Sequence, residues 1–215
     1  MNHSPLAGSA RLGAGLALIA GLTLLLPQAA MATQLPNQNL AQLIGRADLI
    51  VNGQVTAVKD GIQDGLPYTE ITLKVSSSAK KTLAPQSAYT FRQYGLLRAR
   101  KMDDGRYLLP AKIEGMPNWQ VGEKVMAFMN KPAARSGFST PVGLAQGKLT
   151  ITGNKATNGF NNVGLFEGLE VTPGLLRRNE ARMLENRAGG VDLNTLQGLV
   201  QRTVKNNWLA TGAMR

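Results

Sequence analysis

Residues 49–58 read Leu-Ile-Val-Asn-Gly-Gln-Val-Thr-Ala-Val, and residues 71–75 read Ile-Thr-Leu-Lys-Val. In both stretches every second residue belongs to one mainly apolar face, which is the pattern of a strand with one buried side. The Asp-Gly dipeptides at 60–61 and 64–65, together with Pro67, lie between the stretches and favour turns. The sequence therefore predicts an antiparallel hairpin with a connecting loop.

Three further strands complete the predicted sheet. Residues 89–93 alternate in polarity, residues 125–129 are apolar on both faces, and a fifth strand is expected over about 142–152. Glycines inside the first and fifth strands suit the strong coiling that closes a small sheet. We predict a mainly β fold built on a small five-stranded OB-like barrel, with an open sandwich as the alternative.

Helices are expected on both sides of the strands. Residues 35–47 place apolar side chains at helical spacing, and Asn37 or Asn39 is the expected cap. A weak helix is expected after Thr172-Pro173, and a stronger one begins at Asp192, whose side chain suits a cap. The barrel is therefore flanked by an N-terminal helix and by C-terminal helices.

The first 32 residues have the composition of a secretory signal peptide. An apolar run at 12–26 is followed by Pro27 and by the small-x-small triplet Ala-Met-Ala at 30–32. Fifteen helical residues span about 22 Å, less than the roughly 30 Å of a bilayer core. We predict cleavage before Thr33 and a periplasmic or secreted protein with no transmembrane span after cleavage; a retained membrane anchor is the alternative.

The remaining chain divides into a barrel domain and a tail. The OB-like domain is expected over residues 33–170, with an insertion at 95–119, and the helical extension over 171–215. No internal repeat is apparent.

Composition excludes several kinds of chemistry. The 215 residues include no cysteine, and the single histidine is His3 in the predicted leader. Disulfides, thiol nucleophiles and His-based catalysis are therefore excluded from the mature chain, and we predict no metal and no cofactor. Loss of Arg11 with the leader leaves 23 basic against 13 acidic residues, a net charge of +10. That charge favours acidic partners, although it also serves solubility alone.

Few side chains remain that could catalyse a reaction. The carboxylates at 103–104 precede a glycine and suit a turn, and Glu167 and Glu170 are more simply solvated. A dyad of Ser136 with Lys131 would lie in a polar loop without an oxyanion-hole motif. We predict no catalytic residue and no enzymatic activity.

Basic and aromatic side chains interleave in and beside the insertion. OB barrels use such combinations on a strand face and its loops. The predicted binding residues are Arg92, Tyr94, Arg98, Arg100, Lys101, Arg106, Tyr107 and Trp119. Barrel strands also supply aromatic residues to the core and charges to solvent, and this plainer interpretation stays open.

Three segments resemble the barrel of netrin-like modules, the group that includes the tissue inhibitors of metalloproteinases. The segments are Arg-Ala-Asp-Leu-Ile-Val-x-Gly-x-Val at 46–55, Tyr-Thr-x-Ile-x-Leu-x-Val at 68–75 and Gly-Glu-Lys-Val-x-Ala-Phe at 122–128. With Gly-Leu-Ala-Gln-Gly-Lys at 143–148, the chain is similar to uncharacterised secreted bacterial proteins. The resemblance covers roughly residues 48–152 and implies an OB-type fold.

The resemblance does not extend to the inhibitory motif. Those inhibitors chelate the protease zinc through an amino-terminal cysteine, whereas this chain has none and its expected first mature residue is Thr33. The resemblance therefore favours recognition of an extracytoplasmic protein without zinc chelation. The alternative partner is an anionic envelope polymer, either an acidic glycan or lipid head groups, and nucleic acid is poorly matched to export.

Overall fold

The computed structural model describes residues 36–111 and 113–215. The predicted signal peptide at 1–32 and the cleavage point before Thr33 lie outside the described residues. Within the described ranges, no helix combines the length and the apolar character needed to cross a membrane.

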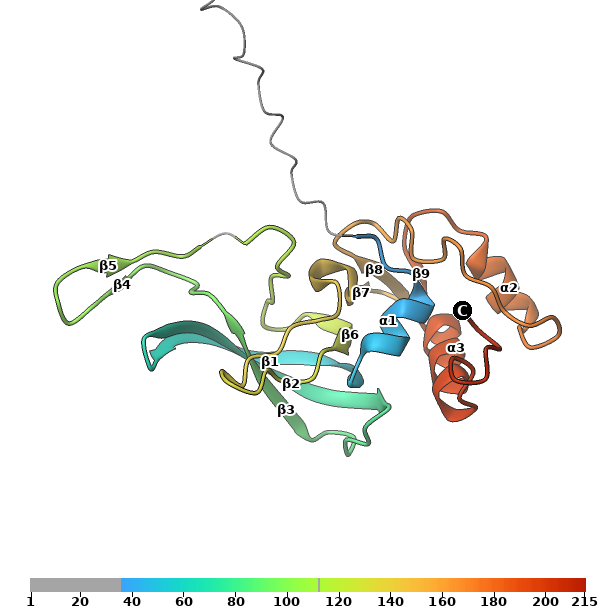
Figure 1. Cartoon of the computed structure of the whole chain (residues 1–215), viewed down its shortest axis with the longest axis horizontal. Coiled ribbons are helices and arrows are strands. Elements are labelled where there is room, and N and C mark those ends of the chain that lie inside the picture. The colour runs from blue at the N-terminus through green and yellow to red at the C-terminus, as the bar shows by residue number, and fades with distance from the viewer. Residues whose placement is uncertain (1–35, 112) are drawn as a thin grey trace, which may run out of the picture. The chain divides into compact units, whose positions relative to one another are not determined.

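Seven strands form one antiparallel sheet in the order β3-β2-β1-β6-β7-β8-β9 (Figure 1). The strands are β1 (Leu49–Gln63), β2 (Leu66–Ala79), β3 (Ala88–Tyr94), β6 (Lys124–Met129), β7 (Lys148–Thr152), β8 (Lys155–Asn158) and β9 (Val191–Asp192). A separate two-stranded hairpin consists of β4 (Arg100–Lys101) and β5 (Tyr107–Leu108). The mainly β class is therefore confirmed.

The β1–β2 hairpin is longer than the sequence suggested. The first Asp-Gly dipeptide does not turn, because Asp60 pairs with Thr69 inside the ladder. The chain turns at Asp64, whose φ of 51° lies in the left-handed region. The register shifts once after Asn52 and again between Val55 and Ala57, as at a β-bulge. A Cβ at Gly53 would lie 2.6 Å from a carbonyl oxygen of β2, so only glycine fits this bulge.

The sheet is open, with β3 and β9 at its two edges, and a closed five-stranded barrel is not confirmed. No strong strand pattern follows Gly153 in the sequence, yet β8 forms there and pairs with β7. The tight turn at Gly153, with φ of 60°, returns the chain directly onto its predecessor. At the β3 edge, the backbone N–H of Ser139 donates to the Arg92 carbonyl at 2.8 Å. Pro141 forms a bridge with Met129 at the end of β6, a strand inside the sheet.

Three α-helices accompany the sheet: α1 (Leu40–Arg46), α2 (Arg178–Leu184) and α3 (Leu193–Lys205). A short 3-10 helix, η1, spans Leu144–Gln146. The side chain of Asn39 accepts a hydrogen bond from the N–H of Gln42 at 3.0 Å, and Asp192 accepts one from Thr195 at 2.8 Å. Both expected caps are therefore confirmed. Residues 171–215 contain α2 and α3 and also add β9 to the sheet.

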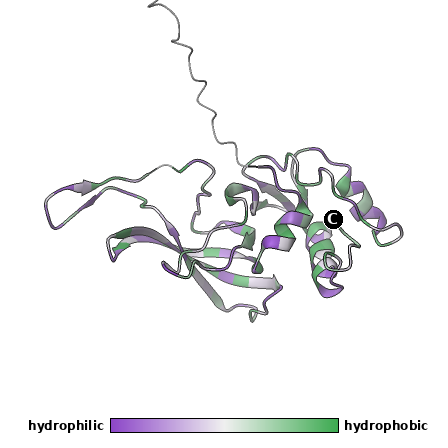
Figure 2. Ribbon diagram, in the orientation of Figure 1, coloured by the Kyte–Doolittle hydropathy of each residue, from purple (hydrophilic) through white to green (hydrophobic). Residues whose placement is uncertain are grey.

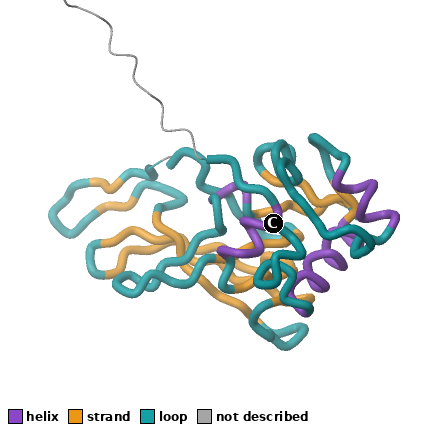
Figure 3. The backbone as a smooth tube through the Cα atoms, turned by 45° about the vertical axis from the view of Figure 1, so that its right-hand side comes forward, coloured by secondary structure: helices purple, strands orange, loops and turns teal. Residues whose placement is uncertain are grey.

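Apolar side chains are buried on both faces of the sheet, and hydrophobic and hydrophilic residues alternate along β2 (Figure 2). One core packs the helices onto the sheet; its fully buried members include Leu40, Leu43, Phe128, Leu149 and Leu196. The other core lies on the opposite face of β1, β2, β3 and β6 and includes Val51, Ile71, Leu73, Phe91 and Trp119. Helices α2 and α3 lie at one end of this arrangement and the β4–β5 hairpin at the other (Figures 1 and 3).

Candidate functional site

The insertion at 95–119 projects from the sheet as the β4–β5 hairpin (Figure 1). Its strands pair Lys101 with Tyr107, and the backbone N–H of Met102 donates to the Arg106 carbonyl at 2.7 Å. The Asp-Asp-Gly turn expected from the sequence therefore closes the hairpin.

The carboxylate of Asp60, in β1, holds the near end of the insertion against the sheet. Its Oδ2 accepts hydrogen bonds from the backbone N–H groups of Leu97 at 2.8 Å and Arg98 at 3.3 Å. Arg100 forms an ion pair with the same carboxylate and donates to the Asp60 carbonyl at 2.6 Å. Because the Asp60 side chain is only 4% exposed, this contact is largely shielded from solvent.

The electrostatics of Asp60 favour its ionised form. Burial alone would raise the pKa of Asp60, but the hydrogen bonds from the Arg100 side chain and from two backbone amides outweigh burial. The pKa of Asp60 therefore lies below the ordinary value of 3.8, and the anchor is fully charged at neutral pH.

The cations of the predicted binding site fall into two groups. Three are ion-paired: Arg92 with Glu70, Arg100 with Asp60 and Arg106 with Asp104. The other two, Arg98 and Lys101, are exposed and form no ion pair with the described residues. Only these two therefore offer a full positive charge to a partner.

Large apolar and aromatic side chains are exposed on and around the hairpin. We call them the apolar rim: Tyr94, Leu97, Tyr107, Leu109 and Ile113. Leu109 is the most exposed of the five, at 66% exposure. A group of exposed apolar side chains of this kind marks an interaction surface more often than scattered single residues do.

A pocket of about 740 Å³ lies at the root of the insertion, between the end of β3 and residues 110–118. The rim residues Tyr94, Leu97 and Ile113 line it, and Glu114 is the charged residue among its described lining. This volume suits a small ligand or one anchoring side chain of a partner together with its neighbours.

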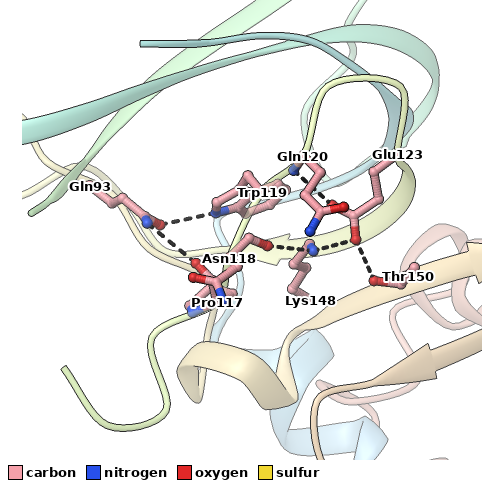
Figure 4. A network of polar contacts seen from close by, with 8 residues as sticks. All are labelled: Gln93, Pro117, Asn118, Trp119, Gln120, Glu123, Lys148 and Thr150. Atoms are coloured by element: carbon pink, nitrogen blue, oxygen red, sulfur yellow. Dashed lines mark hydrogen bonds and ion pairs between the residues drawn. The ribbon is translucent and has the colours of Figure 1, made fainter. Parts of the chain in front are cut away.

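Trp119 does not belong to the exposed surface, contrary to its prediction as a binding residue. It is buried, and its indole N–H donates to Gln93 Oε1 at 3.0 Å (Figure 4). Its ring packs edge-on against Phe91, with 5.2 Å between ring centroids. The insertion returns to the sheet here, and the apolar ring covers the face of β3 that would otherwise meet water.

A buried ion pair between Lys148 and Glu123 ties the far end of the insertion to β7 (Figure 4). Lys148 Nζ donates to Glu123 Oε1 and to the Asn118 carbonyl, both at 2.6 Å. Thr150 Oγ1 donates to the same carboxylate oxygen at 2.6 Å, and Lys148 Nζ lies 5.0 Å from the centroid of the Trp119 ring. Burial lowers the pKa of Lys148, and the contact with Glu123 opposes that shift.

This polar network also borders a second pocket, of about 320 Å³. The second oxygen of Glu123 accepts from the backbone N–H of Gln120 at 3.3 Å. Both carboxylate oxygens of Glu123 and two of the three Lys148 donors therefore already have protein partners. We conclude that the pair positions the insertion.

Three of the side chains considered for catalysis, Asp104, Ser136 and Glu170, have structural partners. Asp104 pairs with Arg106 inside the hairpin turn, and Ser136 Oγ accepts from the backbone N–H of Phe138 at 3.2 Å. Glu170 pairs with the exposed C-terminal residue of the chain. Among the residues that the structure describes, no cluster of three or more Asp, Glu or His side chains is placed to hold a metal ion.

Sequence reasoning missed Asp60, Glu123 and Lys148 as positioning residues. Asp60 precedes a glycine and was expected in a turn, and its partners follow about 40 residues later. Lys148 alternates with Leu149 in the ordinary pattern of a half-exposed strand, so no local signal marks it as buried.

Comparisons with known proteins give no match: no family model, no curated protein and no solved structure corresponds to this chain. The resemblance to netrin-like modules therefore stays a prediction.

Proposed function

We propose that this chain is an exported, non-enzymatic binding module that recognises an extracytoplasmic protein through the apolar rim and the adjoining cations Arg98 and Lys101. The observation that carries this proposal is the exposure of five large apolar or aromatic side chains, four on the anchored insertion and one, Tyr94, at the adjoining end of β3. Arg and Tyr are enriched where interfaces concentrate their binding energy, and both types occur here.

Anchoring at both ends favours recognition by the insertion. Asp60 fixes residues 97–100, and the Lys148 network fixes residues 117–119. An arm held in this way loses less conformational entropy on binding than a loose loop of similar length. The unpaired cations favour a partner that places carboxylates beside an apolar side chain.

The predicted leader supports export, with cleavage before Thr33 or retention as an anchor. We further propose that β1, β2, β3 and β6 correspond to the OB-like barrel of netrin-like modules. The hydrogen bond from Ser139 to Arg92 and the bridge from Met129 to Pro141 support this assignment, because they place residues 139–141 beside both β3 and β6.

Binding of an envelope polyanion by the same insertion is the second candidate. The net charge of the chain favours it, since basic residues exceed acidic ones by about ten without the leader. Carboxylates of the chain itself already pair with Arg100 and Arg106 of the insertion and with Arg92 beside it, however, which leaves Arg98 and Lys101 as the unpaired cations among its described residues. The protein partner is therefore the better supported candidate.

Site-specific photo-crosslinking in the envelope of the native host tests the proposal. A photoreactive amino acid replaces Tyr107 in one strain and Lys205, exposed on α3, in a matched control strain. We expect one defined protein adduct at Tyr107 that is absent at Lys205. The adduct protein is then purified, and its affinity for the wild-type chain is measured by calorimetry.

Salt and one further variant separate the two candidates. An interface centred on apolar contacts survives a rise from about 50 mM to about 500 mM salt, and Leu109→Ser weakens it. If binding is lost at high salt and the Leu109→Ser variant binds as tightly as wild type, the polyanion is the supported partner instead. Equal adducts at Tyr107 and Lys205 would contradict recognition by the insertion.

A further inference from the structure

Four arginines lie in and beside the short helix α2, which among the described residues is at the opposite end from the β4–β5 hairpin (Figure 1). They are Arg177, Arg178, Arg182 and Arg187. All four are exposed, and none forms an ion pair with a described residue. We call them the arginine face.

The helix directs its exposed arginines and its buried residues to opposite sides. Glu180 and Met183 are buried against the core, whereas Arg178 and Arg182, one turn apart, are exposed. Glu180 is not available to neutralise them, because it is 1% exposed and forms an ion pair with Arg202 of α3. The two exposed guanidinium groups start from backbone positions about 6 Å apart along the helix axis.

One exposed carboxylate, Glu185, accompanies the four arginines in this segment. The arginine face therefore keeps most of its positive charge, unlike the insertion, where carboxylates pair with two of the four described cations. Arginine presents a planar fork of donors that fits carboxylates in a bidentate manner, and all four cations here are arginine.

We infer that the arginine face binds a linear anionic polysaccharide carrying carboxylate groups. The regular succession of charges along such a polymer matches guanidinium groups spaced along one helix and the turn that follows it. The contact would hold the module on an acidic polymer and leave the insertion, at the other end, free for its protein partner.

Two other anionic partners fit the surface less well. Peripheral binding to a bilayer usually adds exposed apolar side chains to the basic ones, and the exposed large apolar residues of the described chain all precede residue 164. Single-stranded nucleic acid is held by aromatic stacking, yet Trp208, the aromatic residue of the C-terminal segment, is only 5% exposed.

Calorimetry with polygalacturonate, a linear polymer of carboxylated sugars, tests this inference on the mature chain. The test variant combines Arg178→Gln, Arg182→Gln and Arg187→Gln. The control combines Lys74→Gln, Lys124→Gln and Arg135→Gln, which remove the same charge from exposed positions outside both α2 and the insertion. We expect the test variant to bind roughly tenfold or more weakly, a loss of at least about 1.4 kcal/mol, and the control to change binding less than about threefold.

A gain-of-affinity variant makes the test independent of any folding defect. Glu185→Gln removes the one exposed carboxylate from the segment and should strengthen binding by about twofold to threefold, more at low salt than at high salt. Circular dichroism checks that all variants keep the wild-type fold.

Three results would overturn the inference. One is absence of measurable binding of the wild-type chain to polygalacturonate at about 50 mM salt. Another is an equal loss of affinity in the two triple variants. The third is tighter binding to anionic phospholipid vesicles or to duplex DNA than to the polysaccharide, which would assign the arginine face to that partner.

Discussion

The insertion and the arginine face are both basic and both exposed, but they differ in how many of their cations form ion pairs within the chain. In the insertion, carboxylates on β1 and in the hairpin itself pair with Arg100 and Arg106, and apolar side chains form much of the exposed surface. At α2, four arginines have no ion-pair partner among the described residues. The same residue type therefore fixes backbone position at one end and remains available to a ligand at the other.

The insertion is itself divided between structural ends and an exposed middle, and its two aromatic residues test that division. Trp119→Ala should lower the free energy of unfolding by about 3–5 kcal/mol, because it opens a cavity beside Phe91 and leaves Gln93 without its donor. Tyr107→Ala should change the free energy of unfolding by less than about 0.5 kcal/mol, because the Tyr107 side chain is 63% exposed. Urea denaturation measures both. Similar losses in the two variants would contradict the division.

The Lys148–Glu123 pair should give the next largest effect. Lys148→Ala leaves the buried carboxylate of Glu123 without its ion-pair partner and opens a void beside it. The expected loss is about 2–4 kcal/mol in unfolding free energy. The double variant Lys148→Met with Glu123→Met should recover most of that loss, since neither charge then remains buried. A double variant that is less stable than Lys148→Ala would show that the charges themselves are needed.

Asp60 should affect the insertion more than the whole fold. Asp60→Asn weakens the contacts to Leu97, Arg98 and Arg100, with an expected loss of about 1–2 kcal/mol in unfolding free energy. Amide hydrogen exchange should accelerate at residues 97–101 while the β1–β2 ladder stays protected. Unchanged exchange in the hairpin would show that Asp60 does not anchor it.

The wild-type anchor should also weaken in acid. The pKa of Asp60 is lower in the folded chain than its ordinary value of 3.8, so its stabilising contribution is complete above that value. As the pH falls below 3.8 and through the folded pKa, the contribution disappears, and exchange at 97–101 should rise. The Asp60→Asn variant should lack this component of the pH dependence.

The smallest effect on folding is expected from the two unpaired cations of the insertion. Arg98→Ser combined with Lys101→Ser should shift the melting temperature by no more than a few degrees, because exposed charges contribute roughly 0–1 kcal/mol. Differential scanning calorimetry measures the shift. Unfolding of this variant would assign a structural role to both side chains.

Local signals in the sequence predicted local structure well. The asparagine before α1 and the aspartate before α3 act as caps, and alternation identified β1, β2 and β3. Pairing between distant segments was harder to predict, because strand periodicity does not specify which edges meet. The sheet consequently extends to β8 and β9 and stays open.

The same limitation applies to the candidate site. Composition located the basic and aromatic residues of the insertion, yet their environments depend on residues far away in the sequence. Arg100 is neutralised from β1, and Trp119 is buried by contacts with β3. A list of charged and aromatic residues could not separate those that anchor the arm from those that remain exposed on it.

The most direct measurement compares the affinity of the protein crosslinked at position 107 for three forms of the chain: wild type, Leu97→Ser with Leu109→Ser, and the triple α2 variant Arg178→Gln, Arg182→Gln, Arg187→Gln. Loss of two exposed apolar contacts should weaken binding by roughly 100-fold, while the α2 variant should bind like wild type. Wild-type affinity in the Leu97→Ser, Leu109→Ser variant, with the fold intact, would contradict recognition through the apolar rim.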